Sequence, residues 1–578
     1  MRILFLTHAF NSLTQRLYSE LVARGHRVSV EFDIADSVAE EAVALFKPEL
    51  IIAPYLRRAI PESIWRTITC LIVHPGIVGD RGPSALDWAV QEGESEWGVT
   101  VLQAEAEMDA GPVWASETFL LRGAAKASLY RREVTEAARR AVLLAVERFA
   151  GGDFVPAPLH SIAERRGELR ALMKQEDRRI DWTKDSTAAV LARINAADGF
   201  PGVADKLFGQ PCHLFDACAE STAFAGKPLS LRFSGFPAGT VVARRETALL
   251  RKTTDGAVWV GHVKRAGGIK LPAVLAFADE VPGLPELVPE SHWAPNDTTW
   301  QDIRYEEAGA VGFLHFDFYN GAMSTAQCRR LQEAYQWACT RPTQVLVLLG
   351  GADFWSNGVH LNVIEAAESP ADESWANINA MNDLAEAIIR TASHLTIAAL
   401  QGNCGAGGCF LARAADFVWV RDGVLLNPHY KNMGNLYGSE YWTYLLPARV
   451  GEDAALAIMQ NRLPMTAADG VSKGFLDACL APDHAAFLVE VADRAAAMAA
   501  SADLVQRLSA KAERRLRDEA VKPLASYRAE ELSHMRRNFY GFDPSYHVAR
   551  FRFVHKAPNS WTPRHLAIHR DLGWKIPE

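Results

Sequence analysis

The sequence predicts a multidomain α/β protein. We expect a doubly wound parallel sheet first, a small β-barrel next, and a second α/β unit with a helical tail last. A chain of 578 residues is too long for one hydrophobic core and favours two to four domains. Strand-like apolar runs alternate with amphipathic helical segments over the first 92 residues. Beyond about residue 165 this pattern changes to short alternating segments with Gly and Pro turns, typical of a small β domain.

The first segment has the βαβ pattern of a Rossmann-like domain. Ligands of such sheets bind at the carboxyl ends of the strands, and His74 directly follows one of them. The expected elements are the strand Arg2–Leu6, a helix from Ser12 to Ala23 that ends at Gly25, the strand Arg27–Phe32, a helix over Val38–Phe46, the strands Leu50–Ala53 and Thr69–Val73, and a helix from about Ser84 to Glu92.

The middle of the chain starts with a helix at Thr187–Ala197 and continues as short strands to about residue 275. Four prolines mark Val281–Asn296 as a linker. The second α/β unit has apolar strands at Thr343–Leu349 and Leu395–Leu400, and residues 454–537 are mainly helical, whereas 538–578 have no clear periodicity. The expected domains are therefore a Rossmann-like one over 1–165, an OB-like β-barrel over 166–280, a linker over 281–305, and the last domain over 306–578.

The composition excludes several classes of protein. With 61 Lys and Arg against 69 Asp and Glu, the net charge is −8, so no basic field favours nucleic acid. No apolar stretch approaches the roughly 18–20 residues that span a bilayer, and the short run Met1–Leu6 fits a strand better than a signal peptide. The eight cysteines are scattered without CxxC spacing. We therefore expect reduced thiols, a cytoplasmic location, and no metal site.

His74 and Asp109 are the candidate catalytic residues of the first half. His74 stands before Pro-Gly at a strand end, and Asp109 lies in a turn between the strand-like runs Gly98–Leu102 and Pro112–Thr118. A histidine can act as general acid or base, and a nearby carboxylate would hold its tautomer and stabilise its charged form. Taken singly, either residue is more often structural than catalytic.

These residues lie in runs that resemble the folate-dependent formyltransferase family, which includes methionyl-tRNA formyltransferase. The matching runs are IVHPGIVGDRGPS (72–84), WGVTVLQAEAEMDAGPV (97–113), PELIIAPYLRRAIP (48–61), RRIDWTKD (178–185) and GFPGV (199–203). The resemblance covers about residues 1–275. It implies formyl-tetrahydrofolate as substrate and a catalytic role for His74 and Asp109. It also implies a pterin cradle and Gly-rich loops that contain Pro54, Leu56, Gly82 and Gly111.

The sequence departs from this family at one important position. The asparagine that polarises the formyl oxygen in the family is replaced by Ile72. Asn11, Ser84 or a protonated His74 would then have to donate that hydrogen bond. Alternatively, transfer is slow or hydrolytic, or the fold is kept only as an inactive scaffold.

Two Gly-rich turns distinguish the second half. They are Ser356-Asn357-Gly358-Val359 and Gly405-Ala406-Gly407-Gly408. Such turns let backbone N–H groups approach a developing oxyanion. Stabilisation of the oxyanion by these groups is usually the largest electrostatic contribution to catalysis in acyl chemistry. A dinucleotide site is disfavoured because the third glycine of its motif would fall on Phe410. Tight packing of the backbone remains the alternative explanation for either turn.

Together the two turns resemble the crotonase (enoyl-CoA hydratase/isomerase) superfamily over about residues 306–500. The resemblance implies a coenzyme A pocket with Gly358 and Gly408 in its turns and with an oxyanion hole formed by the N–H groups of Val359 and Gly407. The positions of the hydratase carboxylates hold Phe410 and His429, so hydration of an enoyl thioester is not expected.

Tyr430 and Glu440 are the candidate acid and base of the second half. Both lie in the run LNPHYKNMGNLYGSEYW (426–442), which follows the second turn. A tyrosine and a glutamate that face one small cavity could transfer a proton. The alternative is that Tyr430 only packs and that Glu440 is a solvated helix residue. A contribution from His429 is left open.

The fusion of these two units resembles the HypX/HoxX-type hydrogenase maturation factors. That resemblance implies transfer of the formyl group from formyl-tetrahydrofolate to coenzyme A and decarbonylation of formyl-CoA. The carbon monoxide would become a ligand of [NiFe]-hydrogenase iron. One coenzyme A would then serve both sites.

Two alternatives remain. The first is transfer to another acceptor, with a second domain that hydrolyses a CoA ester. The second is a non-catalytic scaffold that docks the [NiFe]-hydrogenase large subunit or its maturation proteins.

Overall fold

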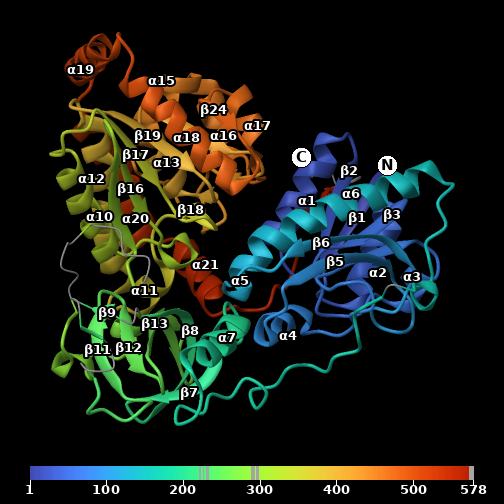
Figure 1. Ribbon diagram of the computed structural model, residues 1–578. Helices are drawn as coiled ribbons and strands as arrows, with labels where there is room; N and C mark the ends of the chain where they lie inside the picture. The colour runs from blue at the N-terminus through green and yellow to red at the C-terminus, as the bar shows by residue number, and fades with distance from the viewer. Residues whose placement is uncertain are drawn as a thin grey trace. The chain divides into compact units, whose positions relative to one another are not determined.

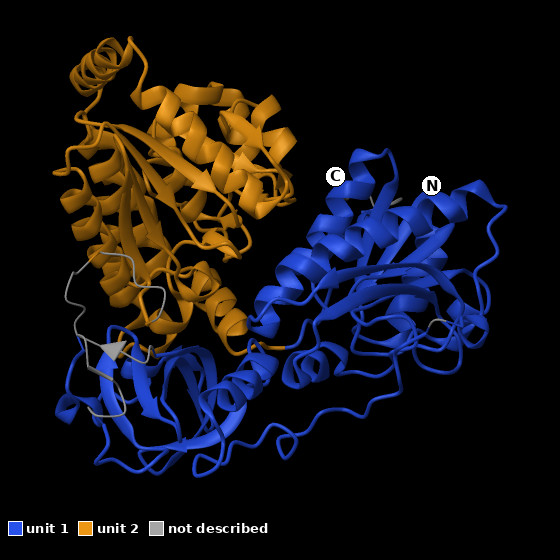
Figure 2. Cartoon of the chain, viewed as in Figure 1, with its two compact units in different colours: residues 1–287, 558–578 blue, residues 288–557 orange. Residues whose placement is uncertain are grey.

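The computed structural model describes all residues except 164, 221–222, 225–226, 229–232, 288–292, 294–298 and 572–578. The chain forms two compact units, which Figure 2 shows in blue and orange. Unit 1 consists of residues 1–287 and 558–578, and unit 2 of residues 288–557.

Unit 1 begins with a six-stranded sheet in the order β2-β1-β3-β4-β5-β6 (Figure 1). Strands β1 to β4 are parallel to one another, and their apolar residues are almost all buried. The bounds of the strands are β1 (Arg2–Thr7), β2 (Arg27–Phe32), β3 (Leu50–Ala53), β4 (Cys70–His74), β5 (Glu96–Gln103) and β6 (Val113–Leu120).

The sheet is not parallel throughout, in contrast to the sequence-based expectation. Strand β5 pairs antiparallel with both β4 and β6. The connection between β5 and β6 is a short turn over residues 104–112, and a turn of this length can join only antiparallel neighbours. The main helices of this domain are α1 (Ser12–Ala23), α2 (Asp36–Phe46), α4 (Ala85–Glu92) and α6 (Thr135–Gly151).

The second part of unit 1 is a small antiparallel sheet with the order β11-β12-β13-β8-β7, to which β14 adds beside β13. Its inner face buries a cluster of aliphatic and aromatic side chains against helix α7 (Thr187–Ala197). The strands are β7 (Val203–Leu207), β8 (Gln210–Ala219), β11 (Val241–Arg245), β12 (Ala248–Lys252), β13 (Ala257–Arg265) and β14 (Lys270–Pro272).

Unit 2 contains two sheets with the orders β15-β16-β17-β19-β21-β24 and β18-β20-β22-β23. The larger sheet holds the core, and the smaller one carries the Gly-rich turns. The larger sheet consists of β15 (Ile303–Ala308), β16 (Val311–Phe316), β17 (Val345–Leu349), β19 (Leu395–Leu400), β21 (Phe417–Arg421) and β24 (Ala478–Leu480). The smaller sheet consists of β18 (Phe354–Ser356), β20 (Asn403–Gly405), β22 (Leu425–Asn427) and β23 (Met465–Thr466).

Helices of unit 2 cover both sheets, and five of them matter for the site. They are α10 (Thr325–Ala338), α12 (Pro370–Arg390), α13 (Gly407–Arg413), α20 (Leu524–Tyr540) and α21 (Ser545–Val554). Helix α21 lies in the segment for which the sequence has no clear periodicity. Within the described part of the chain, no helix is both long and apolar enough to cross a membrane.

The end of the chain belongs to unit 1, although we expected the last domain to run over 306–578. The Val30 N–H donates to the carbonyl of Leu566 at 3.0 Å, and the Phe32 N–H donates to Thr562 Oγ1 at 2.9 Å. These bonds cover strand β2, which is the edge of the first sheet. The tail therefore protects an edge that would otherwise present unpaired backbone groups.

Candidate active sites

In unit 1, His74 lies at the carboxyl end of β4 between two carboxylates. Its Nε2 is 2.8 Å from Asp80 Oδ1, and its Nδ1 is 3.6 Å from Asp109 Oδ2. The histidine is only 5% exposed. The structure thus brings His74 and Asp109 together, as the resemblance implied, and adds a second acid that the sequence reasoning missed.

Asp109 is held in a strained turn that approaches the histidine. Its φ of +54° lies in the left-handed region, which costs free energy for a residue with a side chain. The Gly82 N–H donates to Asp109 Oδ2 at 3.2 Å. A Cβ on Gly111 would lie 1.9 Å from the carbonyl oxygen of Gln103, and one on Gly82 would lie 2.2 Å from that of Arg170. Both glycines are therefore required by close backbone approach.

Asp80 is completely shielded from solvent, and its second oxygen lies 3.9 Å from Arg170 Nε. A Cβ on Gly76 would lie 2.5 Å from His74 Nε2 and 2.6 Å from Asp80 Oδ1, so only glycine leaves room for this pair. The sequence has no signal for it, because an aspartate six positions after a histidine matches no regular spacing. A buried acceptor on Nε2 orients the imidazole so that Nδ1 faces Asp109.

The loop after β3, which we expected to cradle the pterin, crosses the carboxyl edge of the sheet. Pro54 is buried, and Leu56 packs partly buried against the core. The carbonyl of Tyr55, which lies between them, accepts hydrogen bonds from the His8 N–H at 2.6 Å and from Thr7 Oγ1 at 3.1 Å. These bonds fix the loop to the end of β1.

Ile72 lies within β4 and pairs with Leu102, and its aliphatic side chain cannot donate a hydrogen bond. Asn11 Oδ1 caps α1 by accepting from the Thr14 N–H at 3.0 Å. Ser84 Oγ accepts from the Met173 N–H at 3.1 Å. Among the described residues, neither Asn11 nor Ser84 is hydrogen-bonded to His74. The side-chain oxygens of Asn11 and Ser84 are thus used in structural hydrogen bonds.

The first Gly-rich turn of unit 2 follows β18. Gly358 has a φ of +78°, and its N–H donates to Ser356 Oγ at 3.1 Å. Its carbonyl accepts from the Met323 N–H at 2.9 Å. These two bonds fix the peptide that precedes Val359. The Val359 N–H has no hydrogen-bond partner in the described part of the chain.

The second turn links β20 to α13 and touches the first. Ala406 has a φ of +47°, and α13 begins at Gly407, whose N–H has no acceptor within its own helix. A Cβ on Gly358 would lie 3.3 Å from Gly407 N, and one on Gly408 would lie 2.3 Å from the carbonyl oxygen of Ser356. The N–H groups of Val359 and Gly407 therefore belong to adjacent turns, as an oxyanion hole requires.

Tyr430 and Glu440 form a hydrogen-bonded pair beside these turns. Tyr430 Oη donates to Glu440 Oε2 at 2.5 Å. A Cβ on Gly407 would lie 2.2 Å from Glu440 Oε1, so the carboxyl group lies over the second turn. Glu440 is 1% exposed, which contradicts the alternative of a solvated helix residue.

The environment of this pair sets its protonation. Burial raises the pKa of Glu440 to about 7, the hydrogen bond from Tyr430 opposes the rise, and the charge of Glu531 adds to it. Burial and the neighbouring Glu440 hold the pKa of Tyr430 well above its usual value, so the phenol keeps its proton. Near neutral pH the pair therefore combines a base that can be either charged or neutral with a permanent donor.

No carboxylate occupies the positions used by the hydratases. Phe410 stacks on the Tyr430 ring, with ring centroids 5.7 Å apart and planes 15° from parallel. His429 is buried next to Tyr430 in sequence. One of the two positions thus holds a ring that stacks on Tyr430, and the other holds a buried histidine.

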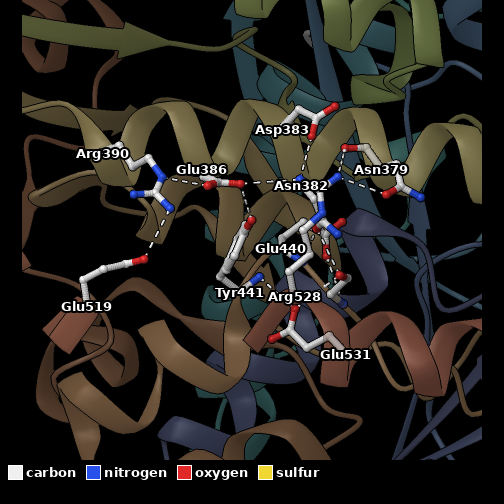
Figure 3. A network of polar contacts seen from close by, with 11 residues as sticks. Asn379, Asn382, Asp383, Glu386, Arg390, Glu440, Tyr441, Glu519, Arg528 and Glu531 are labelled. Carbon is white, nitrogen blue, oxygen red and sulfur yellow. Dashed lines mark hydrogen bonds and ion pairs between the residues drawn. The ribbon is translucent and has the colours of Figure 1, made fainter. Parts of the chain in front are cut away.

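Figure 3 shows a polar network behind Glu440 that the sequence reasoning missed. Asn382 Oδ1, on α12, accepts from the Glu440 N–H at 2.8 Å. Glu531, on α20, contacts the residues on both sides of Glu440. These partners come from distant parts of the chain, so no local spacing could have indicated them.

Comparisons with known proteins identify the domains that carry these two sites. The chain matches the formyl transferase family over residues 3–146, the formyl transferase C-terminal domain over 172–278, and the enoyl-CoA hydratase/isomerase family over 319–556. It is 29% identical over 256 residues to the methionyl-tRNA formyltransferase of Chloroflexus aurantiacus. The matched segment covers 41% of this chain and 79% of that protein.

Two relatives match the whole chain. The hydrogenase maturation factor HoxX of Bradyrhizobium diazoefficiens is 54% identical over 572 residues, which cover 99% of this chain and 97% of that one. The crystal structure of HypX from Aquifex aeolicus in complex with tetrahydrofolic acid superposes with a TM-score of 0.93 at 46% identity and covers 100% of both chains. The chain therefore belongs to the HypX/HoxX family of hydrogenase maturation factors and joins a formyltransferase domain to a crotonase-like domain.

Proposed function

We propose that the protein transfers the formyl group of formyl-tetrahydrofolate to the thiol of coenzyme A and then decarbonylates the formyl thioester to carbon monoxide. The carbon monoxide would supply the ligand of [NiFe]-hydrogenase iron. The observation that carries this proposal is the Tyr430–Glu440 pair, which lies over an oxyanion-type turn where the hydratase acids are missing.

The first site contains the general acid and the general base that transfer of a formyl group from folate requires. His74, oriented by Asp80, can donate a proton to the folate nitrogen as it leaves, and Asp109 can accept the proton of the incoming thiol. Before that transfer, the Nδ1–H of His74 would donate to the formyl oxygen, since Nε2 is held by Asp80. The tetrahydrofolic acid complex of the Aquifex aeolicus relative supports folate as the ligand of this family.

The second site fits a small thioester. The missing side chains of Gly358 and Gly407 leave the two turns open for close approach of a carbonyl group, since a Cβ at Gly407 would collide with Glu440. Val359 and Gly407 would hold the carbonyl oxygen through their N–H groups. Phe410 and Tyr430 fill the adjacent space, which suits an acyl group of one carbon better than a longer chain.

Decarbonylation needs one base and one donor. Glu440, as carboxylate, removes the formyl proton, and the carbon–hydrogen electron pair remains on the carbonyl carbon. The carbon–sulfur bond breaks with its pair on sulfur, so carbon monoxide is released. Glu440 then returns the proton to the thiolate. Tyr430 stabilises the carboxylate form of Glu440 by donating a hydrogen bond to it. The net change converts a formyl thioester into carbon monoxide and a thiol, without water or an oxidant.

We place this reaction in the cytoplasm, and the family membership suggests that the hydrogenase or its maturation proteins receive the product. The eight cysteines all lie in the described part of the chain and form no disulfide, which is compatible with a reducing compartment. Coenzyme A would act as a carrier that both sites use.

The test is a single-tube assay with isotopically labelled formyl-tetrahydrofolate, coenzyme A and purified protein. We expect labelled carbon monoxide in the gas phase, in proportion to the folate consumed, and none when coenzyme A is omitted. Production of labelled formate alone would contradict decarbonylation. It would favour the alternative of a folate-dependent transferase joined to a CoA-ester hydrolase.

A further inference from the structure

The backbone at the proposed base of the second site is strained. Glu440 and Tyr441 have φ values of +59° and +60°, so two consecutive residues with side chains adopt the left-handed conformation. Contacts with the surrounding structure must maintain this turn, because each residue would otherwise adopt a backbone conformation with negative φ. The turn is what directs the Glu440 carboxyl toward Gly407.

Glu531 supplies most of the contacts that hold this turn (Figure 3). Its Oε2 accepts from the Tyr441 N–H at 3.0 Å and lies 3.2 Å from Ser439 Oγ. Its Oε1 accepts from the Thr443 N–H at 2.9 Å and from Thr443 Oγ1 at 2.6 Å. The carboxyl is fully buried and thus binds the chain immediately before and after Glu440.

We infer that Glu531 is a positioning residue for the decarbonylation step, because its carboxylate holds the turn over Ser439–Thr443 that directs Glu440 at the oxyanion hole. This inference rests on the proposed function. The Tyr441 N–H, the Thr443 N–H and the Thr443 hydroxyl donate to Glu531, whereas the one hydroxyl hydrogen of Ser439 is shared between Glu531 and Asn382 Oδ1. These donors reach both oxygens of Glu531, so a group with two acceptor oxygens is required. A glutamine would turn an NH₂ group toward two of these donors and could not replace it.

Glu531 also acts on Glu440 through its charge. The groups that face Glu440 are Tyr430, which donates to it, the neutral Asn382 from α12, Cys328 from α10, and Glu531 from α20. Glu531 is the one carboxyl group among these four, and burial raises its own pKa to about 7, so it is partly ionised near neutral pH. A negative charge at Glu531 disfavours ionisation of Glu440 and makes it a stronger base.

The Tyr441 side chain has hydrogen-bonded partners of its own that do not involve Glu531. Tyr441 Oη donates to Glu386 at 2.7 Å, and Glu386 pairs with Arg390 at 2.7 Å. Because these contacts lie on Tyr441 and α12, the Tyr441 side chain keeps its anchor in a Glu531 variant. The expected effect is a loosened Glu440 rather than a collapsed unit.

The experiment compares Glu531→Gln with Glu530→Gln in the full chain. Glu530 is the adjacent residue on α20, where it is exposed and pairs with Lys522. Formyl-CoA is supplied directly, so that the first site is not needed. For Glu531→Gln we expect kcat for carbon monoxide release to fall roughly 10- to 100-fold, with KM changed by no more than about twofold. Folate consumption and the melting profile should stay near those of Glu530→Gln.

Infrared difference spectroscopy gives a readout that does not depend on turnover. The C=O stretch of protonated Glu440, identified by its loss in Glu440→Gln, should titrate at lower pH in Glu531→Gln than in Glu530→Gln. A change in this direction follows from removal of a like charge. A merely structural role of Glu531 would not move that titration.

Thr443→Val provides a milder variant in case Glu531→Gln does not fold. It removes one donor to Glu531 without changing any charge, and we expect a smaller fall in kcat. The inference is overturned if both Glu531→Gln and Thr443→Val match Glu530→Gln in kcat and in the Glu440 titration. If the wild-type protein releases no carbon monoxide, the proposed function fails instead, and the infrared titration distinguishes the two failures.

Discussion

Glu440 and Glu531 are two carboxyl groups buried in one unit, and the cost of ionising them affects both stability and activity. Burial raises the pKa of each from 4.5 to about 7, which corresponds to about 3 kcal/mol per group. Because the folded pKa exceeds the unfolded one, the folded protein binds these protons more tightly. This stabilisation is complete below about pH 4.5 and is lost as the pH rises through about 7. A buried carboxyl group whose ionisation costs this much free energy is a candidate functional residue.

The pH dependence of carbon monoxide release follows from the same shift. If Glu440 acts as the base, only its carboxylate form is active, so kcat should fall as the pH is lowered through about 7. Glu440→Gln should abolish release while folate consumption continues. Tyr430→Phe should lower the rate and move the midpoint upward, because the hydrogen bond from Tyr430 favours the charged form. The measurement is headspace carbon monoxide against pH, and normal output from both variants would remove this pair from the mechanism.

At the first site, Asp80→Asn tests whether the buried acid orients His74. The amide keeps the shape of the side chain but can present an NH₂ group to His74 Nε2, so the orientation of the imidazole is less defined. We expect formyl transfer to slow on the order of 100-fold, measured by folate consumption. Glu107→Gln is the matched control, since Glu107 is exposed and pairs with Arg81 in the same region. Equal rates in the two variants would show that Asp80 is not needed.

His74→Ala complements this test by removing the proton carrier itself. Formyl transfer should stop, whereas coenzyme A should still bind and formyl-CoA should still release carbon monoxide. Unchanged folate turnover would move the chemistry of the first half to another residue.

At the scale of elements, the second Gly-rich turn and the start of α13 together would form one side of the oxyanion hole. The substitution Gly407→Ala tests this role. The added Cβ would lie 2.2 Å from Glu440 Oε1, so the carboxyl or the turn must shift. We expect carbon monoxide release to fall by about 10²- to 10³-fold, the usual effect of losing an oxyanion donor. Folate consumption should not change. Gly151→Ala, where nothing lies within 4 Å of the new Cβ, is the control. A fully active Gly407→Ala protein would argue against this turn as the oxyanion site.

Elements with a strong local signal could be predicted from the sequence. The helix Ser12–Ala23 and the strands Arg27–Phe32 and Leu50–Ala53 have the expected bounds, because apolar periodicity and flanking Gly or Pro act locally. The antiparallel direction of β5 was not predicted, because strand direction depends on the connection and not on the strand's own residues.

The same division between local and long-range signals applies to the sites. Tyr430 and Glu440 could be proposed because one short run contains both. Glu531 could not, since it reaches the turn only through the packing of α20. Asp80 is close to His74 in sequence, but only the folded loop turns it toward the ring.

At the scale of the whole molecule, the C-terminal segment returns to the first sheet after unit 2 is complete. Glu31 of β2 is fully buried and is 2.9 Å from His569 Nε2 and 2.6 Å from Arg570 Nη2. Truncation after Ala557 would remove these partners of Glu31 and would open the β2 edge. We expect the melting temperature of unit 1 to fall by several degrees and aggregation to increase. Calorimetry of the full and truncated chains checks this, and an unchanged profile would contradict a stabilising role.

The presence of both sites on one chain matters if the thioester is handed over without release. A mixture of His74→Ala and Glu440→Gln proteins contains one working copy of each site, but on different molecules. A carrier held by one chain encounters its second site at an effective concentration on the order of millimolar, well above micromolar protein in solution. We therefore expect the mixture to release carbon monoxide at less than roughly a tenth of the wild-type rate when coenzyme A is stoichiometric.

Two controls make this mixing experiment decisive. Formyl-CoA added to His74→Ala should give carbon monoxide at the normal rate, which shows that its second site is intact, and the double variant should give none. Full recovery in the mixture after a lag would show that formyl-CoA diffuses freely between molecules. In that case the fusion would serve to produce the two activities in equal amounts, and a single retained carrier would not be needed.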